Sequence, residues 1–159
     1  MSDCRKDCTS TDGWHTMGGD FQIVVLACRQ AVPETEALAG SLEQAGLRAR
    51  VAPEPCSSKV EAYHLLRLLA AEADLVWVAG CPQDRCLLVE GSSRMGRRLA
   101  FAQQYLQEIG LEPERLGLTR LEAGDAPGLA ALVQAIRDRA AGLAPNPARR
   151  RGPAGKESL

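Results

Sequence analysis

Two apolar segments of this chain each lead directly into a cysteine. Residues 21–27 (Phe-Gln-Ile-Val-Val-Leu-Ala) precede Cys28, and residues 74–79 (Asp-Leu-Val-Trp-Val-Ala) reach Cys81 after a single glycine. Short unbroken apolar runs rich in β-branched residues are typical of strands that are covered on both faces of a sheet. Such strands need helices above and below them, so the pattern predicts a layered α/β fold.

Strand-like and helix-like segments alternate along the rest of the chain. Further strands are predicted at residues 47–52 and 116–121, and helices at residues 33–45, 59–72, 94–109 and 126–141. The spacing of Ser58 and Glu61 is a capping-box pattern and predicts the start of the second helix. The alternation predicts a mostly parallel four-stranded sheet with helices on both faces, which binds ligands beyond the carboxyl ends of its strands.

The composition predicts one folded domain over residues 21–142. Residues 1–20 are polar and residues 143–159 are rich in proline, arginine and glycine, so both segments are expected to be disordered tails. Cys4 and Cys8 lie in the first tail, and by themselves they are a weak signal.

Composition also limits the classes of function. No apolar run approaches the roughly 20 residues that span a bilayer, and the polar first residues do not form a signal peptide. A net charge of −1 and a pI near 6.1 disfavour nucleic-acid binding. We therefore expect a cytoplasmic protein that binds neither membrane nor nucleic acid.

The six cysteines of the chain are best interpreted for a reducing compartment. Structural disulfides are uncommon there, which favours metal or redox chemistry over buried inert thiols. Cys28, Cys56 and Cys81 each follow a successive predicted strand, and Cys86 lies on the same loop as Cys81. Because parallel strands end at one edge of a sheet, the four thiols are expected to share one site.

Four thiolates can hold either a zinc ion or a [2Fe–2S] cluster. Structural zinc sites usually contain two short Cys-x-x-Cys pairs, which this sequence lacks, and a domain with this much core does not need zinc to fold. A thiol oxidoreductase usually has two residues between its cysteines, whereas four separate Cys81 from Cys86. A zinc-stabilised interaction module and a thiol oxidoreductase remain alternatives to an iron–sulfur protein.

No other constellation in the sequence points to catalysis. It contains no Gly-x-Ser-x-Gly motif, no phosphate-binding glycine loop and no dinucleotide fingerprint after the first predicted strand. No catalytic residue is therefore predicted. A protein with a cluster and no substrate-binding machinery is most simply an electron carrier.

The residues around these cysteines resemble a known family, the delta (iron–sulfur) subunit of methyl-viologen-reducing hydrogenases. In the family's order, the matching segments are the strand before Cys28, residues 55–60 (Pro-Cys-Ser-Ser-Lys-Val), residues 73–86, Glu90-Gly91, residues 97–99 and residues 110–116. Together they extend over about residues 21–135, which makes the resemblance more specific than any single motif.

The resemblance implies a small flavodoxin-like or Rossmann-like domain that carries a [2Fe–2S] cluster. By position, the ligands would be Cys28, Cys56, Cys81 and Cys86. It also implies a non-catalytic subunit of an oxidoreductase complex. This subunit would relay electrons between a hydrogenase or formate-dehydrogenase-type enzyme and a heterodisulfide-reductase-like flavoprotein.

The chain departs from the family's pattern at three places. The family usually has a further cysteine where this chain has Ala31, His-Pro-Gly-Asp at residues 82–85, and Gly-Asn-Tyr at residues 91–93. The four remaining thiols are sufficient in number for a cluster. The altered loops change the groups near the sulfurs, on which a reduction potential depends.

Overall fold

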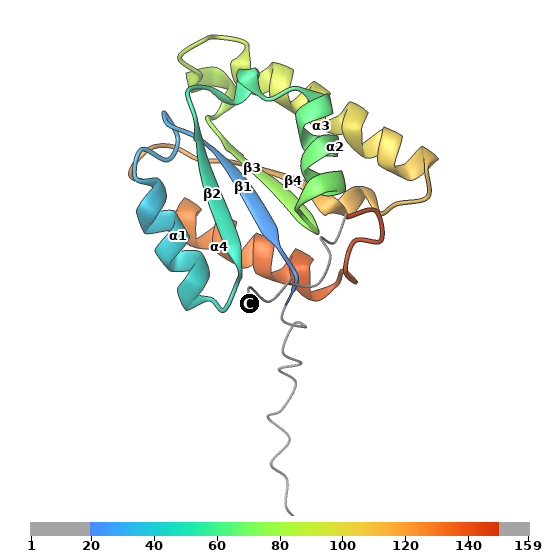
Figure 1. Ribbon diagram of the computed structural model, residues 1–159. Helices are drawn as coiled ribbons and strands as arrows, with labels where there is room; N and C mark the ends of the chain where they lie inside the picture. The colour runs from blue at the N-terminus through green and yellow to red at the C-terminus, as the bar shows by residue number, and fades with distance from the viewer. Residues whose placement is uncertain (1–19, 150–159) are drawn as a thin grey trace, which may run out of the picture.

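A computed structural model describes residues 20–149 and contains one four-stranded sheet with the order β2-β1-β3-β4 (Figure 1). The strands are β1 (Ile23–Cys28), β2 (Ala49–Glu54), β3 (Leu75–Gly80) and β4 (Leu116–Arg120). Every neighbouring pair is parallel. The chain proceeds outward from β1 in one direction to β2 and in the other direction to β3 and β4, as in flavodoxin-like sheets. The predicted α/β fold class is confirmed.

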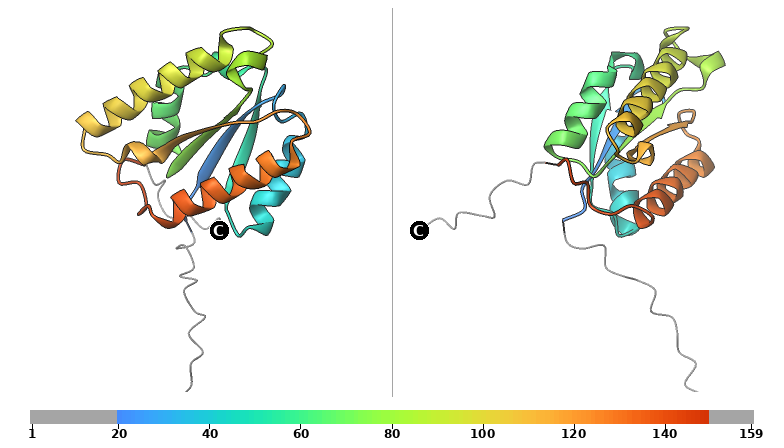
Figure 2. Two further views of the ribbon diagram at one scale, coloured as in Figure 1. Left: turned by 180° about the vertical axis from the view of Figure 1, so that it is seen from behind. Right: turned by 90° about the vertical axis from the view of Figure 1, so that its right-hand side faces the viewer.

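Four helices cover the two faces of the sheet (Figure 2). Helices α1 (Thr35–Gln44) and α4 (Ala126–Ala141) pack on one face, and α2 (Ala62–Ala71) and α3 (Gly91–Glu108) pack on the other. Because side chains alternate along a strand, β1 and β3 supply both cores. The result is the three-layer arrangement that the unbroken apolar strands require.

Strand β2 continues two residues beyond the predicted end at residue 52 and includes Pro53. Proline cannot donate a hydrogen bond to a neighbouring strand, so within a sheet it is confined largely to edges. In the described residues β2 pairs with β1 and forms one edge of the sheet. Pro53 is therefore compatible with the strand, and the prediction that it would end the strand was wrong.

Helix α2 begins at Ala62, three residues later than the capping-box pattern predicted. The N-cap is Glu61, whose backbone N–H donates to His64 Nδ1 at 3.2 Å. Ser58 belongs instead to a short 3-10 turn, and its hydroxyl donates to Cys56 Sγ at 3.2 Å. The predicted cap was wrong because a sulfur two residues earlier takes the serine hydroxyl.

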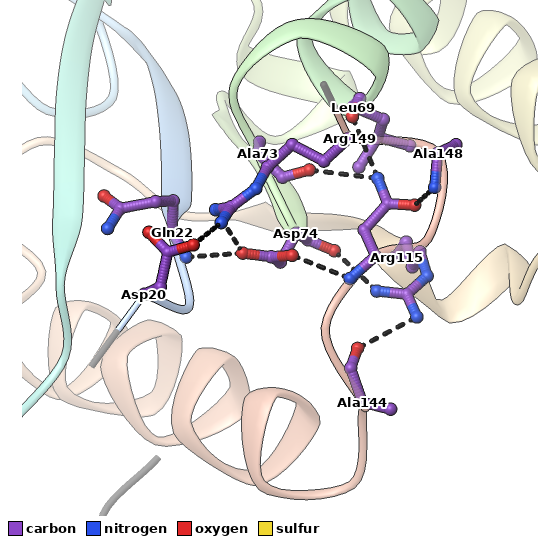
Figure 3. A network of polar contacts seen from close by, with 10 residues as sticks. Asp20, Gln22, Leu69, Ala73, Asp74, Arg115, Ala144, Ala148 and Arg149 are labelled. Carbon is purple, nitrogen blue, oxygen red and sulfur yellow. Dashed lines mark hydrogen bonds and ion pairs between the residues drawn. The ribbon is translucent and has the colours of Figure 1, made fainter. Parts of the chain in front are cut away.

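A buried polar network closes the amino-terminal edge of the sheet (Figure 3). Asp74, which is fully buried, accepts hydrogen bonds from the backbone N–H groups of Gln22 and Asn146, both at 2.7 Å. Arg149 donates to the same carboxylate at 2.6 Å and also forms an ion pair with Asp20. The network joins the first and last described residues to the start of β3.

Residues 143–149, which the sequence assigns to the C-terminal tail, thus lie against the folded domain. Residues 1–19, with Cys4 and Cys8, and residues 150–159 lie outside the described residues. Within residues 20–149, none of the helices combines the length and apolar character that a bilayer span requires.

Candidate metal centre

The carboxyl ends of β1 and β3 form the crevice at which the strand order reverses. Parallel α/β sheets bind ligands at this point, because the connections from the two strands leave on opposite faces. Cys28 is the last residue of β1, and Cys81 follows the last residue of β3. Their sulfurs are 3.6 Å apart, and both residues are buried. The sheet itself therefore builds the first thiol pair.

The distance between the Cys28 and Cys81 sulfurs distinguishes a disulfide from a pair of metal ligands. A disulfide would bring them to about 2.05 Å. Two thiolates on one tetrahedral metal, each with a bond of about 2.3 Å, lie roughly 3.8 Å apart. The observed 3.6 Å between Cys28 and Cys81 matches two ligands of one metal, without a large rearrangement.

The second thiol pair lies around the start of α3. A Cβ atom added to Gly91 would lie 3.0 Å from Cys56 Sγ and 3.1 Å from Cys86 Sγ. Both sulfurs thus adjoin one point that a side chain would occupy. Cys56 is buried and Cys86 is half-buried. Glycine at this helix start leaves room for the two sulfurs to approach each other.

Hydrogen bonds fix the loops that carry the thiols. Cys56 Sγ accepts from the Ser58 backbone N–H at 3.4 Å and from its hydroxyl at 3.2 Å. The Ser92 hydroxyl, at the start of α3, donates to the carbonyl oxygen of Cys81 at 2.6 Å. Arg120, at the end of β4, donates to that serine oxygen at 3.0 Å. The Ser58 bonds thus fix the turn after β2, and the Ser92 and Arg120 bonds join the start of α3 to the carboxyl ends of β3 and β4.

The electrostatic environment of the Cys81 thiol includes the other three thiols. The pKa of Cys81 is raised to about 12, chiefly by burial, and the hydrogen bond with Cys28 and negative charge on Cys28, Cys86 or Cys56 contribute to this rise. Proton loss at one thiol therefore opposes proton loss at the next. A metal cation relieves this repulsion, because thiolates bind it in place of protons.

Two of the four sulfurs, those of Cys28 and Cys81, form one close pair, and those of Cys56 and Cys86 both lie beside Gly91. Among residues 20–149, no group of three or more His, Cys, Asp or Glu side chains is arranged to hold a metal ion. A tetrahedral zinc site would require three or four such ligands. Two neighbouring pairs of thiols instead fit a group with two metals, and the donor chemistry fits iron and sulfide.

The structure thus brings all four predicted residues, Cys28, Cys56, Cys81 and Cys86, to the expected edge of the sheet. Sequence reasoning missed two others. Ser58 was interpreted as a helix cap, although a hydroxyl two residues after a cysteine could also have indicated a sulfur contact. Gly91 was noted only within the segment Glu90-Gly91 that resembles the family, and its contact with two sulfurs distant in sequence was not predicted.

The chain is similar to a known protein family and to several characterised proteins. The family described as "Methyl-viologen-reducing hydrogenase, delta subunit" matches residues 23–143. The iron–sulfur subunit of the vhu F420-non-reducing hydrogenase of Methanopyrus kandleri is 30% identical over 130 residues, which cover 81% of this chain and 98% of that protein. The iron–sulfur subunit of the F420-non-reducing hydrogenase of Archaeoglobus profundus is 35% identical over 97 residues, 60% of this chain and 71% of that protein.

A shorter match is found in a larger protein. This protein is one subunit of the ferredoxin/F(420)H(2)-dependent CoB-CoM heterodisulfide reductase of Methanosarcina acetivorans, and it is 34% identical over 76 residues. These residues cover 48% of this chain and 10% of that protein.

Proposed function

Because the chain belongs to the methyl-viologen-reducing hydrogenase delta-subunit family, we propose that it is an electron-transfer subunit with a [2Fe–2S] cluster on Cys28, Cys56, Cys81 and Cys86. The observation that carries the proposal is the arrangement of these four sulfurs as two adjoining pairs at one sheet edge. When bound, such a cluster accepts and returns one electron at a time.

The arrangement supports a cluster over the two alternatives. A zinc-stabilised module would hold one ion with three or four ligands, whereas a two-metal cluster would use two thiols for each metal, which is how Cys28 with Cys81 and the two sulfurs beside Gly91 are arranged. A thiol oxidoreductase would need a nucleophilic thiol of low pKa, whereas burial raises the pKa of Cys81 to about 12. No observation favours either alternative.

The protein residues have distinct roles in this proposal. Cys28 and Cys81 would hold one metal in the apolar core, where the α1 and α4 side chains exclude water. Cys56 and Cys86 would hold the other metal beside Gly91. The Ser92 hydroxyl donates to the carbonyl oxygen of Cys81 and thereby fixes the backbone of that residue. The Cys81 sulfur would therefore keep its orientation toward the metal when the charge of the cluster changes.

The names of the relatives support a proposal about the partners. Those related along nearly their whole length are iron–sulfur subunits of hydrogenases, and the larger relative belongs to a heterodisulfide reductase. We propose that this chain joins a hydrogenase or formate-dehydrogenase-type donor to a heterodisulfide-reductase-like flavoprotein in a hetero-oligomer. We place it in the cytoplasm, where a reducing environment keeps its thiols available for metal.

Anaerobic purification of the full chain with its partner subunits tests this function. The expected result is two iron and two acid-labile sulfide per chain, visible absorbance, and an EPR signal after reduction by dithionite. Stoichiometric zinc without sulfide would select the interaction module. Colourless protein without iron would defeat the electron-transfer proposal.

A further inference from the structure

The two thiol pairs have unlike surroundings. Cys28 and Cys81, which are 1% and 5% exposed, belong to the apolar core under α1 and α4. Among the described residues, Cys56 is the one cysteine of the four whose sulfur accepts hydrogen bonds from nitrogen and oxygen donors, both of which belong to Ser58. Cys86, the other member of that pair, is half-buried and packs against the same apolar core. The two pairs thus differ in the hydrogen bonds on Cys56, and we call Cys56 and Cys86 the polar pair and Cys28 and Cys81 the apolar pair.

Ser58 is held in place from α3. The Arg98 guanidinium donates to the carbonyl oxygen of Ser58 and, at 3.3 Å, to that of Val60. It also forms an ion pair of 2.8 Å with Glu61, at the start of α2. The side chain of Arg98 is only 28% exposed, so these contacts are shielded from water. The position of the serine hydroxyl is therefore set by tertiary structure.

Hydrogen bonds to a ligand sulfur stabilise the state with more negative charge. An added electron increases the charge on the sulfurs of the metal that receives it, and hydrogen bonds to charged acceptors are stronger than those to neutral ones. The hydrogen bonds that Ser58 donates to the Cys56 sulfur therefore favour the electron on the side of Cys56 and Cys86.

We propose that Ser58 is a positioning residue that sets the reduction potential and draws the electron to the metal held by Cys56 and Cys86. The inference rests on the proposed function. One electron would come from a reduced cofactor of the donor enzyme, without proton transfer and without a change in covalent bonds. The metal that favours it would be bound in part by Cys86, which is followed in the chain by the exposed residues Leu87, Leu88 and Val89 (71%, 55% and 79%).

The first test compares the full chain with its Ser58→Ala variant by EPR-monitored redox titration. At a fixed potential the ratio of reduced to oxidised variant should fall about tenfold, which equals roughly 59 mV for one electron. Ser58→Thr keeps the hydroxyl and should restore the parent potential. Ser93→Ala is the matched control, because that hydroxyl accepts from Arg97 and contacts no sulfur.

The second test locates the electron. In the reduced protein, pulsed electron–nuclear double resonance should detect a strongly coupled exchangeable proton that Ser58→Ala removes and Ser93→Ala retains. If Ser58→Ala binds a normal cluster and neither its reduction potential nor its proton coupling changes, the inferred role of Ser58 is overturned. The proposed function would be unaffected by that result. A parent protein that binds no cluster would overturn the proposed function and this inference together.

Discussion

The sulfur of Cys28 lies 3.6 Å from the sulfur of Cys81, although the two residues are 53 positions apart in the chain. Parallel pairing of β1 with β3, which aligns Ala27 with Ala79, brings their carboxyl ends together. A buried sheet rather than a short motif thereby positions the two proposed ligands. Rigid elements hold ligands more accurately than loops do, so this pair would need little rearrangement to bind a metal.

Loss of a thiol from either pair should release the cluster. Cys28→Ser removes a ligand from the apolar pair, and Cys86→Ser removes one from the polar pair. Each variant should lose most of its iron and sulfide in anaerobic preparations, as measured by chemical assay. Cys4→Ser, which changes a thiol outside the described residues, should keep the parent content. Equal iron in all three variants would contradict the ligand assignment.

A methyl group at residue 91 should disturb the polar pair without unfolding the domain. In Gly91→Ala the new Cβ would lie 3.0 and 3.1 Å from the sulfurs of Cys56 and Cys86, closer than sulfur and carbon normally approach. We expect iron content to fall by more than half while the far-UV circular dichroism is unchanged.

Gly40→Ala is the matched control for this change, because nothing lies within 4 Å of a Cβ at that position in α1. It should keep full iron and stabilise the fold by roughly 0.5–1 kcal/mol. Equal iron content in Gly40→Ala and Gly91→Ala would show that the close approach of the two sulfurs is not needed.

The network at the amino-terminal edge should contribute strongly to stability. Asp74→Asn removes the charge that Arg149 pairs with and places an amide where the carboxylate accepted backbone N–H bonds. Breaking a buried pair of this kind costs about 3 kcal/mol or more in the free energy of unfolding. Urea denaturation of the full chain measures this cost. Glu72→Gln, which breaks the exposed pair with Arg50, should cost less than about 1 kcal/mol.

The Cys81 thiol should be unreactive in metal-free protein. Its pKa is raised by burial to about 12, so the nucleophilic thiolate is scarce at pH 8 and increases only as the pH approaches that value. We expect iodoacetamide to modify Cys86, which is half-buried, well before Cys81, as mass spectrometry of digested protein would show. Rapid alkylation of Cys81 at neutral pH would instead support a thiol oxidoreductase.

Periodicity in the sequence was sufficient to predict the sheet and the edge at which the thiols meet. Apolar runs identified β1 and β3 because both faces of these strands are buried, and the position of each cysteine after its strand then placed it at the shared edge. The division into pairs could not be predicted, since chain order contains no distances. The start of α2 was mispredicted because Ser58 bonds to a sulfur that a local capping rule does not consider.

The C-terminal segment shows a different limit of sequence reasoning. Residues 143–149 have the composition of a tail, yet Asn146 and Arg149 are 1% and 8% exposed. Their shared partner, Asp74, lies 72 and 75 positions earlier in the chain. Local composition cannot reveal a partner at that separation, and a lone aspartate before a strand does not indicate burial.

The ion pair between Asp20 and Arg149 brings together the two ends of the described domain. It joins the first and last of residues 20–149 beside Asp74, at the start of β3 (Figure 3). Cys28 and Cys81 lie at the opposite, carboxyl ends of β1 and β3. Domains whose N- and C-termini lie close together are readily inserted into longer chains. An insertion that joins a host protein to residues 20 and 149 would therefore attach at the end of the sheet opposite Cys28 and Cys81.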